Sequence, residues 1–260
     1  MKDLTPVDHW NQAWAGEIRL RLPSPWIIPT RDLQRLIAKH VRPGQRVLEI
    51  GCAPGKMLSW VAAGLKARVS GVDYSPRGLA QARRLFRALH IPAELRCEDL
   101  RQTTFSPDSF DFVYSIGVIE HFSDPRDIVR SHLSLVRPGG TVLMTVPNYR
   151  GIYGLLQRYF DADSLLMHNL DIMSCEALAR LAPEEGSAQV RTYPAGRMSP
   201  WMLSIGKRWP APLARGLSYT LNAIALLQPV EIAAIAPMLA LEITRSVRHA
   251  RREEAASRRS

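Results

Sequence analysis

Strand and helix patterns alternate along most of this 260-residue chain, and this rhythm constrains the fold more than any other feature. From about residue 30 to residue 193, short runs rich in Val and Ile are followed by stretches with apolar residues at helical spacing. Strands that alternate with helices in this way pair in parallel, and helices cover both faces of their sheet. The pattern therefore predicts an α/β fold built on a doubly wound, mostly parallel sheet.

Capping and turn residues place the individual elements. Strands are expected at 47–50, 68–72, 93–96, 110–116, 141–146, 188–193 and 238–244, and helices at 30–41, 57–65, 75–89, 124–136 and 174–181. The last strand is expected to be antiparallel. Two aromatic-rich segments, 147–173 and 194–237, interrupt the rhythm. Long insertions of this kind on a regular sheet more often cover a site than merely connect elements.

Charge raises the question of partners, because 34 Lys and Arg against 24 Asp and Glu give a net charge of +10. A basic chain of this kind is compatible with nucleic acid or an anionic membrane as partner. Part of the excess, six Arg against two Glu, lies in a C-terminal tail at 245–260, which we interpret as a solvated end. Three scattered cysteines exclude a disulfide framework, and the first residues lack an apolar signal segment. A cytoplasmic protein is expected.

The sharpest local motif is VLEIGCAPGK at 47–56, a strand that enters a tight glycine turn and then a helix. Such a turn brings backbone N–H groups and a helix N-terminus close to a ligand, and it needs small residues for that approach. A nicotinamide or flavin fingerprint would require a small residue where Lys56 stands. The motif also lacks the Gly-Lys-Ser/Thr ending of NTPases. A different nucleoside ligand is therefore indicated.

Acidic residues after the next two strands support that interpretation. Asp73 ends the second strand, 22 residues after Gly51, where its carboxylate can accept hydrogen bonds from both ribose hydroxyls. Asp99, preceded by Glu98, follows the third strand and is placed to accept from an adenine amino group. Tyr74 and Leu100 can sandwich the adenine ring. We therefore count these five residues as candidate cofactor ligands.

Five motifs in order, VLEIGCAPG, GVDYSP, CEDL, FDFVYSIGVIEHF and LVRPGGTVLMTVPN, resemble those of class I S-adenosylmethionine-dependent methyltransferases. The sequence is similar in particular to the small-molecule branch that includes the quinone-biosynthesis methyltransferases, over roughly residues 31–193. The resemblance implies a Rossmann-like fold, S-adenosyl-L-methionine as cofactor and S-adenosyl-L-homocysteine as product. It also implies an N-terminal lid at 1–30, formed by His9, Trp10 and Trp14. The two insertions would cover the acceptor, around a core of 31–193 plus 238–244.

The resemblance also assigns cofactor-binding residues beyond the two aspartates. Residues of the first strand and the turn would line the methionine end: Glu49, Gly51, Cys52, Ala53 and Gly55. Ser115 and Ile116, at the tip of the fourth strand, would face the amino group and the methyl group. Ala53 replaces the glycine that the family carries in the middle of the turn. Because alanine at a positive φ would cost about 1 kcal/mol or more, we expect an ordinary φ there.

Methyl transfer from a sulfonium is an in-line displacement, so the enzyme has chiefly to align acceptor, methyl and sulfur and to exclude water. His121, in Glu120-His121 after the fourth strand, is the expected base or acceptor-orienting group, or a structural histidine. His168 is the second catalytic candidate. The acceptor pocket is expected to include His168 with Tyr149, Tyr153 and Trp10. Glu120 is expected to serve the helix start or a neighbouring cation, and no metal is expected.

Several functions remain open from the sequence alone. A small, partly apolar acceptor methylated on oxygen is the first expectation, with nitrogen and carbon as alternatives. A nucleic-acid substrate is disfavoured because the fourth strand ends in Ser115-Ile-Gly-Val118 rather than in the motif typical of base-amine enzymes, and because no RNA-binding module is present. Residues 201–241 suit a membrane surface or a lipid-linked acceptor. A protein that binds the cofactor without catalysis also fits.

Overall fold

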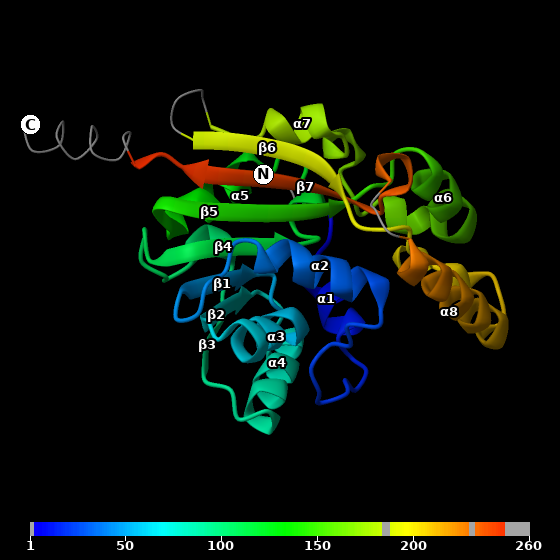
Figure 1. The fold of residues 1–260 in the computed structure, drawn as a ribbon, viewed down its shortest axis with the longest axis horizontal. Coiled ribbons are helices and arrows are strands. Elements are labelled where there is room, and N and C mark those ends of the chain that lie inside the picture. The colour runs from blue at the N-terminus through cyan, green and yellow to red at the C-terminus, as the bar shows by residue number, and fades with distance from the viewer. Residues whose placement is uncertain (1–2, 184–187, 229–231, 248–260) are drawn as a thin grey trace, which may run out of the picture.

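A computed structural model describes residues 3–183, 188–228 and 232–247 of the chain. Its centre is one sheet of seven strands in the order β3-β2-β1-β4-β5-β7-β6 (Figure 1). The strands are β1 (Arg46–Ile50), β2 (Arg68–Asp73), β3 (Ala93–Cys97), β4 (Phe110–Ile116), β5 (Val136–Pro147), β6 (Ala188–Ala195) and β7 (Met238–Arg245). The first five are parallel, and β7 pairs antiparallel with both β5 and β6. The predicted doubly wound fold and its antiparallel last strand are confirmed.

Helices cover both faces of the sheet. They are α1 (Val7–Ala13), α2 (Ile28–Ala38), α3 (Lys56–Leu65), α4 (Pro76–Ala88), α5 (Arg126–Leu135), α6 (Ile152–Leu165), α7 (Cys175–Ala179) and α8 (Ala211–Leu227). One buried core joins α2, α3 and α4 to one face, through residues such as Leu36, Leu58 and Leu79. The other joins α5 and α7 to the opposite face, through Ile128 and Leu178. This two-core arrangement accounts for strands that are apolar on both sides.

Two differences from the predicted elements concern the second half of the chain. β5 begins at Val136 rather than at residue 141, since the predicted turn at 137–140 continues the strand with a register shift opposite Phe110 and Phe112. The two segments that interrupt the rhythm are largely helical, containing α6 and α8, which lie together at one end of the molecule (Figure 1). Among the described residues, no helix is long and apolar enough to cross a membrane.

Candidate functional site

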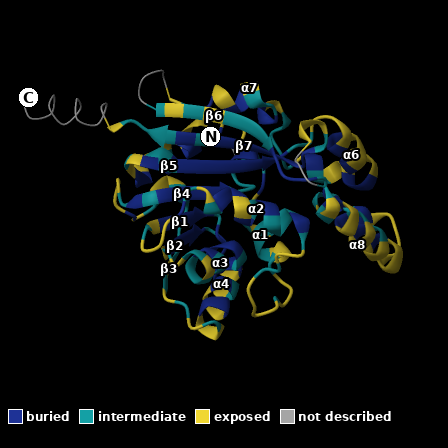
Figure 2. Cartoon of the chain, in the orientation of Figure 1, coloured by how far each residue is buried: buried dark blue, intermediate teal, exposed yellow. Residues whose placement is uncertain are grey.

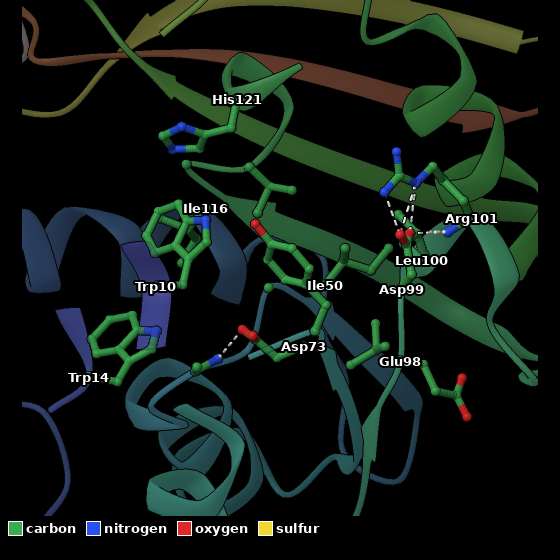
Figure 3. Close-up of a pocket in the computed structure, with 16 residues that line it drawn as sticks. Trp10, Trp14, Ile50, Asp73, Glu98, Asp99, Leu100, Arg101, Ile116 and His121 are labelled. Atoms are coloured by element: carbon green, nitrogen blue, oxygen red, sulfur yellow. Dashed lines mark hydrogen bonds and ion pairs between the residues drawn. The ribbon is translucent and has the colours of Figure 1, made fainter. Parts of the chain in front are cut away.

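A pocket opens at the carboxyl ends of β1, β2, β3 and β4, where ligands of doubly wound sheets bind (Figure 3). Its lining comes from five parts of the chain: Trp10 and Trp14 of the N-terminal segment; Ile50, Gly51 and Ala53; Val72, Asp73 and Tyr74; Glu98, Asp99, Leu100 and Arg101; and Ile116, Gly117, Val118 and His121. Most of the candidate cofactor ligands therefore meet around one cavity.

The glycine turn forms the floor of this pocket. Gly51 has φ +71°, and a Cβ at this position would lie 2.6 Å from Val118 Cγ2. Gly55 also has a positive φ, +88°, and precedes α3, but it packs against Ala82 of α4 rather than lining the pocket. Ala53 is not among the non-glycine residues with positive φ, which confirms the expected ordinary conformation. Glycine is thus required at both positions by a positive φ and by the close approach of a neighbouring side chain.

Asp73 is held rigidly at the end of β2. Its Oδ2 accepts a hydrogen bond from the Ala53 N–H at 3.0 Å, and its Oδ1 accepts one from the Ser75 N–H at 2.8 Å. Burial raises the pKa of the Asp73 carboxyl, and these two backbone hydrogen bonds oppose that shift. The carboxylate keeps further lone pairs toward the pocket, so it can accept hydrogen bonds from a diol.

Arg101 is a lining residue that the sequence reasoning missed. Its guanidinium pairs with Asp99, with Nε 2.9 Å from Oδ1, and with both carboxylate oxygens of Asp3 at 2.8 and 3.0 Å. The pKa of Asp99 is lowered, first by its hydrogen bonds with Arg101. The sequence signal that could have indicated this lining residue is its position two residues after Asp99. The contact orients Asp99 and ties the N-terminal segment to the pocket rim.

The N-terminal segment borders the pocket through Trp10 and Trp14, whereas His9 does not line it, and the lid stays a prediction. The Leu4 N–H donates to the His121 carbonyl at 2.8 Å, and the Tyr74 hydroxyl donates to the Thr5 carbonyl at 3.0 Å. These bonds position α1 so that Trp10 and Trp14 border the cavity (Figure 3). The segment therefore contributes two aromatic walls to the site.

Four predicted cofactor ligands point elsewhere. Because strand side chains alternate between faces, Glu49 and Ser115 lie opposite to Ile50 and Ile116, which line the pocket. Glu49 accepts from the Tyr114 hydroxyl at 3.0 Å inside the core, where burial raises its pKa to about 8. Ser115 is buried, with its hydroxyl 3.0 Å from His132 Nε2.

The other two are near the turn and the third strand. Cys52 is 2% exposed, and its sulfur packs where a Cβ on Gly71 would lie at 2.7 Å. Glu98 borders the pocket, but its carboxylate accepts hydrogen bonds from the Thr103 hydroxyl and the Thr104 N–H at 3.0 and 2.8 Å. It therefore points away from the cavity (Figure 3).

His121 borders the pocket from the side opposite the turn. Its ring lies 4.9 Å from the Trp10 ring, and its Nδ1 is 3.0 Å from the Met167 carbonyl oxygen. Since only a protonated Nδ1 can donate to that carbonyl, the Nε2 lone pair is left free. Burial, and then the charge of His168, lower the pKa of His121 to about 4. The ring is therefore neutral near pH 7, with an unprotonated Nε2.

His168 lies directly behind His121, with 4.8 Å between the ring centres, and does not itself line the pocket. Its Nδ1 is 2.7 Å from the Ser164 carbonyl oxygen, so its Nε2 is free as well. Burial lowers the pKa of His168. The sequence thus placed the two histidines in one locality, but only His121 reaches the cavity.

Glu120 completes this cluster. It is 1% exposed, its Oε2 has no hydrogen-bond partner in the described part of the chain, and burial raises its pKa to about 8, opposed by a hydrogen bond from its own backbone N–H. That N–H belongs to the first turn of the short helix Ile119–His121, and the expected service to a helix start or a cation stays a prediction. Ligand atoms of Glu120, His121 and His168 lie within 4.8 Å of one another, a spacing that a metal ion would also accept. The expectation of no metal stays a prediction.

The two candidate acceptor tyrosines lie behind the pocket. The Tyr149 ring contacts the His168 ring edge-on at 5.3 Å, and its hydroxyl donates to the Met202 carbonyl at 3.4 Å. Tyr153 is 4% exposed, and its hydroxyl accepts from the Ser199 N–H at 2.7 Å. Tyr153 therefore holds the loop before α8 and does not border the pocket, whereas Trp10 does.

Comparisons with known proteins agree with this geometry. Residues 47–140 match the family model described as a methyltransferase domain. The ubiquinone biosynthesis O-methyltransferase of Xanthomonas campestris pv. campestris is 33% identical over 117 residues, which are 45% of this chain and 48% of that protein. The chain thus matches about half the length of this curated relative. Residues 47–140 are thus similar to a methyltransferase domain, in agreement with the resemblance of the sequence motifs.

Solved structures establish the fold of the larger part of the chain. The phosphoethanolamine N-methyltransferase 2 of Haemonchus contortus, solved with S-adenosyl-L-methionine, superposes with a TM-score of 0.58 at 21% identity. The alignment covers 83% of this chain and 51% of that one. The [4+2]-cyclase SpnF superposes with a TM-score of 0.57 at 19% identity, over 84% and 82% of the two chains. The fold therefore extends well beyond residues 47–140.

Proposed function

We propose that this protein transfers the methyl group of S-adenosyl-L-methionine to a hydroxyl of a small, partly apolar acceptor. The observation that carries the proposal is one pocket that joins Asp73, Asp99 and the Gly51 turn to a free imidazole nitrogen of His121. The 33% identity to an O-methyltransferase of ubiquinone biosynthesis supports oxygen as the methylated atom.

The residues present fit this cofactor. The Gly51 turn borders the pocket without a side chain, and both Asp73 oxygens are already oriented by backbone N–H groups. Asp73 would hold the ribose hydroxyls, Asp99 the adenine amino group, and Leu100 and Tyr74 the ring faces. When bound, the cofactor supplies an electrophilic methyl group on sulfur. Trp10 and Trp14 exclude water from that end of the pocket.

The acceptor would lie between His121 and the cofactor end of the pocket. A neutral His121 would take the hydroxyl proton of the acceptor at Nε2, while the Met167 carbonyl keeps the ring oriented through Nδ1. His168 and the carboxyl of Glu120, which do not line the pocket, lie within reach of that imidazole and would orient it. The apolar Trp10 ring on the other side suits an acceptor with an aromatic or aliphatic body.

Calorimetric titration with S-adenosyl-L-methionine and S-adenosyl-L-homocysteine tests the cofactor half of the proposal. We expect micromolar binding to the wild-type protein and about 100-fold weaker binding to Asp73→Ala, because two charge-assisted hydrogen bonds are lost. Asp111→Ala, a partly exposed carboxylate paired with Arg137 outside the pocket, is the matched control. A folded wild-type protein that binds neither compound would overturn the proposal.

Turnover with hydroxylated aromatic acceptors tests the second half. Methyl transfer that depends on His121 supports it. Binding of the cofactor with no methyl transfer to any hydroxyl, amine or carbon acceptor would leave a protein that only binds it. The [4+2]-cyclase among the structural neighbours shows that a similar fold occurs in a protein named for a different reaction. The expected cytoplasmic location stays a prediction.

A further inference from the structure

Helix α8 has its polar side turned inward and its apolar side turned outward. The buried positions are small or polar: Ala214, Ser218, Asn222 and Ala225. The exposed positions carry large apolar side chains: Leu213 (63% exposed), Tyr219 (59%), Ile224 (55%) and Leu227 (84%). A helix that packs on its own protein to satisfy the hydrophobic effect shows the reverse pattern. Tyr219 meets the Trp201 ring edge-on at 5.4 Å, whereas Leu213, Ile224 and Leu227 are each more than half exposed on the outer side of α8.

Hydrogen bonds fix this orientation. Asn222 Oδ1 accepts from the Ile28 N–H at 2.9 Å and from the Trp201 indole N–H at 3.3 Å. Its Nδ2 donates to the Trp26 carbonyl at 2.9 Å. Rotating α8 to bury its leucines would break all three bonds and leave buried polar groups unpaired. The apolar side is thus held toward the outside.

Helix α6 carries a similar stripe beside α8. Ile152, Leu155, Leu156 and Tyr159 recur at helical spacing and are 37–66% exposed. The two helices share a small core of Phe160, Ile205 and Ala214 and lie together, with exposed positions facing away from the sheet (Figure 2). Eleven of the sixteen exposed large hydrophobic residues among those described lie between 152 and 227. We call the exposed apolar residues of α6 and α8 the outer face.

Positive charge accompanies the outer face. Between residues 194 and 228 the sequence has Arg197, Lys207, Arg208 and Arg215 and no Asp or Glu. Arg197 is buried against Asp32, whereas Arg208 lies over the Tyr159 ring, 4.9 Å from its centre, and Arg215 is exposed. Lys207 pairs with Asp161 of α6 at 2.7 Å. Exposed cations next to tyrosine and tryptophan rings are typical of helices that lie at a bilayer interface.

We propose that the outer face binds the surface of an anionic lipid bilayer, with α6 and α8 lying in the interface plane. A second copy of the chain bound to the outer face would bring the cations of two outer faces together. Anionic lipid headgroups would instead neutralise these cations. Trp26, 71% exposed and tied to α8 through Asn222, and Trp209, 39% exposed, would lie at the headgroup level. The proposal concerns where the protein works and does not depend on the reaction it catalyses.

Vesicle co-sedimentation of the full chain tests the proposal. We expect binding to vesicles of phosphatidylcholine with one third phosphatidylglycerol, and at least tenfold weaker binding to phosphatidylcholine alone. The double variant Ile224→Ser, Leu227→Ser should bind the anionic vesicles at least tenfold more weakly, since each side chain loses the gain of about 1.5 kcal/mol or more from burial. Leu20→Ser, Leu22→Ser, an exposed pair outside the outer face, is the matched control and should bind as the wild type does.

The Arg-rich end of the chain is an alternative lipid ligand that a second variant separates. Most of it, residues 248–260, lies outside the described residues. Replacing Arg251, Arg252, Arg258 and Arg259 by Gln should leave most vesicle binding in place. Loss of binding in this variant with full binding by the Ile224/Leu227 variant would overturn the proposal. So would a wild-type dimer, seen by sedimentation velocity, that the Ile224/Leu227 variant dissociates. Unchanged binding of S-adenosyl-L-homocysteine shows that each variant is folded.

Discussion

The pocket has two ends: a cofactor end around Asp73 and an acceptor end around His121, each named for the proposed ligand. The two ends differ in how their polar side chains are hydrogen-bonded. At the cofactor end, the side chains that face the ligand are fixed by neighbouring backbone, as with Asp73 between the Ala53 and Ser75 amides. At the acceptor end, Glu120 is buried with no hydrogen-bond partner for Oε2 among the described residues, and two imidazole nitrogens are free. Buried polar groups without partners are costly, so they mark a place where a ligand completes the bonding.

The same contrast extends to the supporting elements. The cofactor end stands on β1 to β4, whose side chains fill two large cores. Helices α6 and α8, which contribute no residue to the lining of the pocket, share a core of only Phe160, Ile205 and Ala214 with their neighbours. The proposed cofactor site therefore stands on a large core, whereas α6 and α8 rest on a much smaller one.

The largest expected effect lies where the two ends meet. His121→Ala should lower kcat by about 10²–10⁴-fold with cofactor affinity within threefold, because the base is lost and Asp73 is untouched. Because burial lowers the pKa of His121 to about 4, the wild-type kcat/KM should stay constant from pH 8 to about 5.5 and fall only below that. His168 lies behind His121 and does not line the pocket. The variant His168→Gln is therefore the matched comparison and should lower kcat less than His121→Ala does. Equal kcat values for His121→Ala and wild type would contradict the assignment.

Two glycines test whether the cofactor end is the more tightly constrained one. Gly51→Ala should weaken cofactor binding by about 30-fold or more, since its φ of +71° costs an L-residue roughly 1–2 kcal/mol and its Cβ would meet Val118 at 2.6 Å. Gly206 lies between β6 and α8, and a Cβ on it would have no atom within 4 Å. Gly206→Ala should therefore leave cofactor binding unchanged. Calorimetry on both variants measures the difference. Similar affinities would show that the turn adapts.

The sequence predicted the cofactor end in most respects, for physical reasons. A strand that must stay apolar on both faces, a cap such as Ser75 and a glycine turn each leave a local pattern. Glu49 and Ser115, which the resemblance assigned to the cofactor, do not line the pocket. Pleat alternation decides which neighbour faces the ligand, and Ile50 and Ile116 do so.

The acceptor end was less accessible to sequence reasoning. Its contacts join residues far apart in the chain, as when the Thr5 hydroxyl and the Met167 carbonyl meet at His121 Nδ1. The inverted α8 also gives a misleading signal, because an apolar stripe at helical spacing normally marks the buried side. Only the position of Asn222, bonded to Ile28 and Trp26, decides which side faces inward.

The buried carboxyl at the acceptor end predicts a moderate effect on stability. Burial raises the pKa of Glu120 to about 8, so the folded protein keeps it protonated while the unfolded chain ionises above about 4.5. Its stabilising contribution is therefore complete below pH 4.5 and is lost as the pH rises to 8. Relative to Glu120→Gln, the wild type should lose more than about 1 kcal/mol of unfolding free energy between pH 5 and pH 8. Urea titrations at the two pH values measure this.

Glu98→Gln is the control for that experiment, because its hydrogen bonds with Thr103 and Thr104 oppose burial and leave its pKa lowered. Its contribution has the opposite sign, being present at higher pH and lost as the pH falls. Identical pH dependence of the wild type and Glu120→Gln would mean that water or a ligand satisfies the carboxyl, and the contrast between the two ends would disappear.

The smallest expected effect concerns the exposed side of α8. It distinguishes this helix from one that packs its apolar side inside the protein. Leu227→Ser should change the free energy of unfolding by less than about 0.5 kcal/mol, because the side chain is 84% exposed and gains little from folding. Leu58→Ser, in the α3 core at 0% exposure, should cost about 2–5 kcal/mol. Urea unfolding of both variants gives the comparison. A cost above about 1 kcal/mol for Leu227→Ser would mean that the outer side of α8 is covered within the protein itself, and a helix so covered has no apolar face left for a bilayer.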